Sequence, residues 1–156
     1  MTNRAAVVYV VGLPAPQGSK KGFYNKKTKR VQMVESSSKV KPWREAVKWS
    51  VLEDSENPVP KPGLEPFAGG VSVTLVFYLP RPRGHYRTGV NSDRLRPSAP
   101  RFPSTRPDID KLARSTLDGL KDAGLYEDDS RVVDLTLRKR YADHAVPGCA
   151  VKVSES

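Results

Sequence analysis

The sequence predicts an α/β chain, in the α+β sense of a mixed β-sheet with packed helices, folded as one small domain over residues 1–156. Its length of 156 residues suits a single hydrophobic core. Large apolar side chains occupy every second position from Val71 to Leu79, which is typical of a strand with a buried face. Between Ile109 and Leu120, apolar residues recur every three or four positions, as on one face of an α-helix.

The N-terminal third is expected to form a strand, a hairpin and a helix. Ala5–Val11 is a nearly continuous apolar run, as in a buried strand. Residues 22–25 and 30–34 flank a Lys-Lys-Thr-Lys turn, which predicts a basic β-hairpin. Pro42 suits the first turn of a helix whose apolar positions continue at helical spacing to Val51.

The remaining elements follow from turn residues and alternation. Residues 57–70 hold four prolines and three glycines, so they predict a loop. Gly124 suits the end of the helix that begins near residue 110. Alternating side chains predict a strand over 131–141, and the apolar positions within 149–153 predict a short last strand.

Charge is distributed unevenly along the chain. The 27 Lys and Arg exceed the 17 Asp and Glu, for a net charge of +10, which favours a polyanionic partner. Residues 17–48 carry ten basic and two acidic side chains, whereas residues 108–129 carry seven acidic and three basic ones. One cysteine excludes an internal disulfide and a CxxC zinc site, and two histidines argue against a His-rich metal site. With no apolar run long enough to span a bilayer, we expect a cytoplasmic protein without membrane contacts.

Residues 80–107, called the arm below, combine six prolines at positions 80 to 107 with seven arginines and one aspartate. Proline interrupts helices and sheets alike, so a long loop is expected here. Loops of this length within a compact domain are usually functional or disordered. We interpret the arm as a mobile segment that contacts a polyanion, with Arg81, Arg83 and Arg87 among its DNA-binding residues.

The acidic stretch suggests a metal site. Asp108 and Asp110 open the predicted helix, and Asp128 and Asp129 follow it. A helix over 110–122 rises about 18 Å, and an extended segment over 124–129 spans at most about 20 Å. The chain can therefore return and bring a late acid beside the early pair. Oxygen-only ligands favour Mg²⁺ or Mn²⁺. The alternative is that these acids only cap a helix or turn.

Three motifs together resemble the RusA family of Holliday junction resolvases. The first is Arg-Pro-Asp-Ile-Asp-Lys-Leu at 106–112, the second is Leu-Asp-Gly-Leu at 117–120, and the third is Asp128–Asp129 before a strand. The opening segment 12–20 and the Trp-Arg pair at 43–44 are similar to the start of that family. The resemblance covers most of the chain in order.

The resemblance implies a homodimer that resolves four-way DNA junctions with Mg²⁺, or with Mn²⁺ in its place, and without a small-molecule cofactor. Asp108, Asp110 and Asp129 would be the catalytic, metal-binding carboxylates. Arg114 stands where the family usually has a lysine near the scissile phosphate, and Lys111 replaces the usual asparagine. The family occurs in bacteria and very often in their phages.

Further basic residues are expected along the DNA path. Lys20, Lys21, Lys111 and Arg114 are the candidates outside the arm. Residues 138–140, at the end of a predicted strand, could contact phosphate or protect a sheet edge. The predicted function is therefore a Mg²⁺-dependent endodeoxyribonuclease for Holliday junctions in recombination and repair. Two alternatives are a less selective branched- or flap-DNA nuclease and a non-enzymatic basic DNA-binding protein.

Overall fold

The computed structural model describes residues 4–18, 20–35, 38–53, 66–143 and 146–156. Its main sheet contains the strands β1 (Ala5–Val11), β6 (Gly148–Glu155), β4 (Val71–Leu79) and β5 (Val132–Tyr141), in that spatial order. The pairs β1–β6 and β6–β4 are antiparallel, whereas β4–β5 is parallel. The expected mixed sheet of an α+β fold is confirmed.

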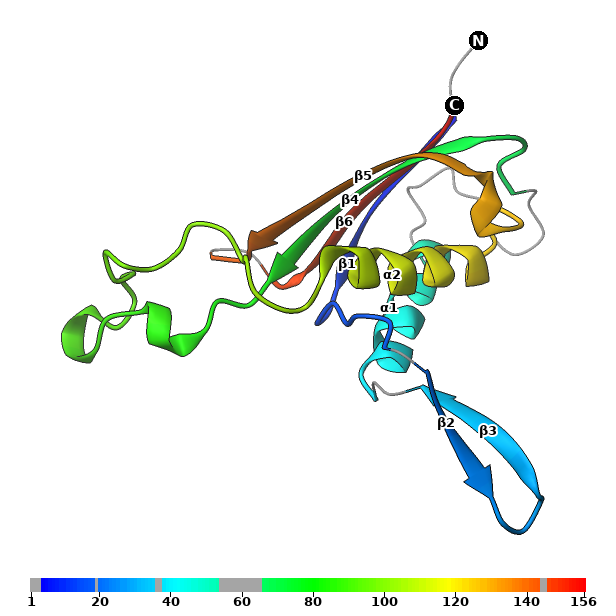
Figure 1. The fold of residues 1–156 in the computed structure, drawn as a ribbon. Coiled ribbons are helices and arrows are strands. Elements are labelled where there is room, and N and C mark those ends of the chain that lie inside the picture. The colour runs from blue at the N-terminus through cyan, green and yellow to red at the C-terminus, as the bar shows by residue number, and fades with distance from the viewer. Residues whose placement is uncertain (1–3, 19, 36–37, 54–65, 144–145) are drawn as a thin grey trace.

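Two helices lie on the same face of this sheet (Figure 1). They are α1 (Val40–Glu53) and α2 (Ile109–Asp122), and they pack against one another. The Trp43 indole donates to the Thr116 hydroxyl at 3.0 Å within this buried contact. Gly119 allows the close approach, because a Cβ there would lie 2.8 Å from the Cβ of Val47.

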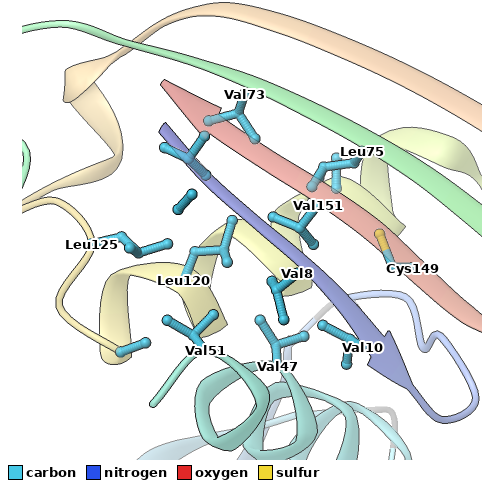
Figure 2. Close-up of a cluster of buried hydrophobic side chains, with 14 of the residues drawn as sticks. Val8, Val10, Val47, Val51, Val73, Leu75, Leu120, Leu125, Cys149 and Val151 are labelled. Carbon is cyan, nitrogen blue, oxygen red and sulfur yellow. The ribbon is translucent and has the colours of Figure 1, made fainter. Parts of the chain in front are cut away.

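The core lies between the helices and the sheet (Figure 2). The alternation predicted for β4 is observed, since its odd-numbered residues are buried and the even-numbered ones are only partly buried. Leu75 of β4 and Val151 of β6 face Val47 of α1 and Leu120 of α2 across this layer. Apolar burial therefore fixes α2 against the sheet.

A separate two-stranded hairpin projects from the body (Figure 1). It consists of β2 (Lys20–Asn25) and β3 (Arg30–Glu35), as the sequence predicted. The Asn25 carboxamide oxygen accepts the amides of Lys27 and Thr28 at 2.9 and 3.3 Å, which closes the turn. Of the expected loop over 57–70, residues 57–65 lie outside the described residues, and residues 66–70 contain no helix or strand.

The arm contains more local structure than its composition predicted. Two short 3₁₀ turns occur at Arg83–His85 and Gly89–Asn91, and Tyr86 pairs with Leu95 as an isolated β-bridge. The arm projects from the end of β4, away from the helices (Figure 1). None of the helices in the described ranges is long and apolar enough to cross a membrane.

Candidate active site

Helix α2 presents two carboxylates at its start. Asp108 occupies the N-cap position with an extended backbone (φ −71°, ψ 137°), yet its side chain makes no capping hydrogen bond. Its carboxylate lies 3.8 Å from the ammonium of Lys111. Asp110, in the first turn, and Arg114, one turn later, are exposed. The helix therefore forms without using either carboxylate as a cap.

The start of α2 is anchored to the end of β5. The ammonium of Lys139 donates to the carbonyl oxygens of Thr105 and Pro107 at 2.7 and 2.8 Å. On the other side, the buried Ser115 hydroxyl donates to the carbonyl of Ala15 at 2.6 Å. These bonds fix the backbone on both sides of Asp108. Because the Lys139 ammonium donates to these two carbonyls, Lys139 holds the site in place. Of the two roles expected for residues 138–140, phosphate contact therefore does not apply to Lys139.

Asp129 lies elsewhere, in a 3₁₀ turn before β5 (Asp129–Arg131). The preceding Asp128 accepts the amide of Ser130 at 2.9 Å, which lowers the pKa of Asp128 and shows that it caps this turn. Burial raises the pKa of Asp129, and the nearby charge of Asp118 raises it further. The buried Oδ1 of Asp129 has no hydrogen-bond partner among the described residues. Asp129 is thus a carboxylate with one buried oxygen that the described residues leave without a hydrogen bond, although the charge of Lys121 partly offsets the rise in its pKa.

The three predicted metal ligands do not meet within one chain. Asp118 and Asp110 are eight residues apart on α2, which corresponds to a rise of about 12 Å, and Asp129 interacts with Asp118. No group of three or more Asp, Glu, His or Cys side chains in the part of the chain that the structure describes could hold a metal ion. The predicted return of residues 124–129 to the start of the helix is therefore wrong.

The reason is the packing of two residues in that return segment. Leu125 and Tyr126 are buried. The Tyr126 hydroxyl donates to the carbonyl of Leu117 at 2.8 Å, and the carbonyl of Leu125 accepts the amide of Phe67 at 2.8 Å. These contacts hold the segment beside the second half of α2. It does not extend, so β5 begins far from Asp108.

Arg81 is part of the arm's attachment rather than of a DNA-facing surface. Its guanidinium binds the carboxylate of Asp143 at 2.6 Å and the carbonyl of Pro100 at 2.6 Å. It also lies 4.0 Å from the centroid of the Tyr141 ring, and its side chain is only 3% exposed. The expectation that Arg81 contacts DNA is therefore wrong, because its donors are already satisfied inside the protein.

The other predicted arm arginines are exposed. Arg83 and Arg87 both face solvent, and the Arg87 Nε donates to the carbonyl of Leu95 at 3.2 Å. The Arg96 Nε similarly donates to the carbonyl of Tyr86 at 2.8 Å. These bonds connect the two sides of the arm, so some of its arginines shape it. Lys20 and Lys21 belong to β2, but their side chains lie outside the described residues.

A family model described as endodeoxyribonuclease RusA matches residues 14–154. The chain belongs to the RusA family of endodeoxyribonucleases, enzymes that hydrolyse DNA. It is also similar to an uncharacterized protein of Bacillus subtilis (strain 168), YqaN, with 32% identity over 75 residues. That match covers 48% of this chain and 51% of YqaN, so it spans about half the length of this curated relative. The predicted RusA resemblance is confirmed.

Sequence reasoning missed Asp118 as a partner of Asp129 in this RusA chain. Asp118 belongs to the Leu-Asp-Gly-Leu motif and lies on the helix two turns after Asp110. The available signal was the apolar pair Leu125–Tyr126, whose burial forces the acids that follow it toward the second half of α2. The mutual placement of Asp118 and Asp129 follows from that packing.

Proposed function

We propose that this chain is a divalent-metal-dependent endonuclease that resolves four-way DNA junctions, with Asp108, Asp110 and Asp129 as its metal-binding carboxylates. The observation that carries the proposal is that the fold uses none of these three carboxylates as a helix or turn cap. Asp108 does not cap its helix, Asp110 is exposed, and Asp129 retains a buried oxygen without a partner. Family membership supplies the reaction class, hydrolysis of DNA within a strand.

The chemistry of these residues fits a hard cation. All three supply carboxylate oxygens, which Mg²⁺ and Mn²⁺ prefer. The orphaned Oδ1 of Asp129 and its unfavourable proximity to Asp118 are relieved by a positive charge. When bound, such an ion stabilises the negative charge that develops on a phosphate during hydrolysis.

Two cations next to the early acids have different roles. Arg114 is exposed one helical turn after Asp110, and its guanidinium can neutralise charge that appears in the transition state. Lys111 is half-buried and lies within ion-pair range of Asp108, where it orients that carboxylate. The exposed Arg83 and Arg87 of the arm, together with Lys20 and Lys21 of the hairpin, hold the DNA backbone.

The separation of the acids in one chain supports a homodimer in which a second copy completes the site. In such a dimer, the partner's Asp129 would join Asp108 and Asp110 to complete the set of three carboxylates. The segment that carries Asp129 continues into β5, an edge strand of the sheet. Val133 and Leu135 of that strand are 61% and 42% exposed. Exposed apolar residues on a sheet edge favour a protein contact at this position.

The first experiment tests catalysis. A synthetic four-way junction is incubated with wild type, Asp110→Asn and the charge-matched control Glu53→Gln, at an exposed position at the end of α1, in Mg²⁺ and in EDTA. Asp110→Asn should cut at least about 100-fold more slowly while still shifting the junction on a gel in EDTA, and Glu53→Gln should cut like wild type. Equal cutting by wild type and Asp110→Asn would refute the nuclease proposal and favour a non-enzymatic DNA-binding protein. Flap and three-way substrates in the same assay measure selectivity.

The second experiment tests completion by a partner. Asp110→Asn and Asp129→Asn are each expected to be inactive alone. Mixed and allowed to exchange subunits, they form heterodimers with one intact site if the partner supplies Asp129. Nicking should then recover to about a quarter of the wild-type rate, because half of the dimers carry one good site of two. No recovery, with subunit exchange verified by differently tagged chains, would refute a shared site.

A further inference from the structure

A cavity of about 700 Å³ opens beside the early acids. It lies between the N-terminal loop, residues 13–18, and the segment 103–108 that leads into α2. Leu79 and Tyr141, at the ends of β4 and β5, also line it. Asp108 and Lys111 belong to its wall. A cavity of this volume has room for a small organic molecule, far more than one ion or one phosphate occupies.

The lining of this cavity combines two kinds of surface. Proline and leucine side chains provide much of the wall, including Leu13, Pro16 and Pro107. Three cations, Lys39, Arg106 and Lys111, belong to the same lining. A phosphate alone would satisfy the cations and leave the apolar wall in contact with water, whereas an apolar ligand would offer no anion to Lys39 and Arg106. A nucleotide satisfies both, with its base against the apolar wall and its phosphate near the cations.

We propose that this cavity receives one unstacked base of the DNA substrate, next to the scissile phosphate. This inference rests on the proposed nuclease function and extends it to how the substrate is selected. Asp108 lines the cavity and is also one of the proposed metal ligands, so a nucleotide held there presents its own phosphate to the acids. The cavity thus sets the distance between the held base and the cut.

This arrangement selects for branched DNA on energetic grounds. Taking a base out of a continuous duplex costs free energy in lost stacking and pairing, and this cost is lowest where the base is already poorly stacked. In the open form of a junction, where the arms are not stacked on one another, the nucleotides at the branch point lack one stacking neighbour. A base cavity beside the acids therefore makes cutting easier near a branch than within an intact duplex, without any contact to the branch itself.

The test uses a four-way junction with 2-aminopurine, whose fluorescence rises when it unstacks, placed in turn at each nucleotide beside the branch and the cut. In EDTA, wild-type protein should raise the fluorescence several-fold at one of these positions. Leu13→Trp, which fills the cavity from a half-exposed wall position, should bind the junction but abolish the rise. Val146→Trp, at a similarly exposed position outside the cavity lining, should behave like wild type.

Cleavage in Mg²⁺ provides the second measurement. Leu13→Trp should cut the normal junction at least about tenfold more slowly, and an abasic nucleotide at the fluorescent position should restore its rate. Thr105→Trp, an exposed position on the opposite wall, repeats the test if Leu13→Trp does not fold. Absence of a fluorescence rise with wild type, or an unchanged rise with a folded tryptophan variant, overturns the inference. Because fluorescence is read without cutting, a protein that unstacks the base but never cuts would refute only the nuclease proposal.

Discussion

Replacing Gly119 by alanine should destabilise the protein, although alanine is the better helix former. Gly119 lies within α2 where this helix crosses α1. A Cβ at this position would lie 2.8 Å from the Cβ and 2.9 Å from a Cγ of Val47, and 3.1 Å from the carbonyl oxygen of Arg44. The carbonyl belongs to the helix backbone and cannot rotate away. The two helices must therefore separate slightly to accept the methyl group.

The magnitude follows from two opposing effects. Alanine in place of glycine stabilises a helix interior by about 0.8–1.0 kcal/mol, whereas overpacking of a close contact typically costs about 1–3 kcal/mol. Because one neighbour of Gly119 is backbone, we expect the upper part of that range and a net loss of about 1–2 kcal/mol. For a chain of 156 residues, this corresponds to a fall in Tm of roughly 2–8 °C.

Thermal unfolding of wild type, Gly119→Ala, Val47→Ala and the double variant provides the assay. Val47→Ala alone should destabilise by leaving a void, but the two changes together should cost less than their sum by at least about 1 kcal/mol, since the methyl group introduced at position 119 occupies that void. A Tm for Gly119→Ala at or above the wild-type value would refute the argument, because helix propensity would then outweigh the contact. Strict additivity would show that Val47 is not the residue that limits the approach.

Three further predictions concern other parts of the chain. Burial raises the pKa of the Cys149 thiol to about 12, so the folded state keeps this thiol neutral at pH 7, and the protein loses folding stability as pH rises toward that value. Iodoacetamide at about pH 8 should therefore label the urea-unfolded protein but not the native one. Asp118→Asn should raise Tm by roughly 2–4 °C, and by more at pH 7 than at pH 4, because the raised pKa of Asp129 means that its repulsion with Asp118 develops only as pH increases. At pH 7, a Tm of the variant equal to or below that of wild type would contradict this repulsion. Deleting residues 84–102 removes four arginines. The plot of the log of the junction-binding constant against log salt concentration should therefore become less steep, by up to about 3.6. An unchanged slope would show that the arm does not touch DNA.

Elements whose pattern is local were predicted well from the sequence. The alternation of Val71–Leu79 and the apolar face of Ile109–Asp122 reflect which side chains meet the core, and burial in the structure follows both patterns. The end of α2 was also predictable, since Gly124 adopts a positive φ of 85° that suits glycine. The sequence predicts these elements because each strand or helix buries one face, and the residues of that face recur with the period of the element.

The path between elements was less predictable, for a physical reason. The sequence of residues 124–129 permits an extended return, and only the burial of Leu125 and Tyr126 against the body decides otherwise. Arg81 shows the same limit. Its place in an arginine-rich segment predicted a DNA contact, whereas its bonds to Asp143 and Pro100 depend on segments that approach from distant parts of the chain. Individual side-chain bonds of this kind leave no periodic trace in a sequence.

The end of β5 connects the arm to the early acids. Tyr141 of β5 packs under Arg81 at the first end of the arm, and Lys139 of the same strand binds the carbonyls of Thr105 and Pro107 at the other. Both ends of the arm are thus fixed to one strand terminus, next to Asp108. If the exposed arginines of the arm bind DNA as proposed, that DNA would be held in a defined position relative to the acids, since the arm cannot shift at its base without breaking these contacts. Under the proposed function, the long arm adds affinity for DNA without loosening the geometry of the cut.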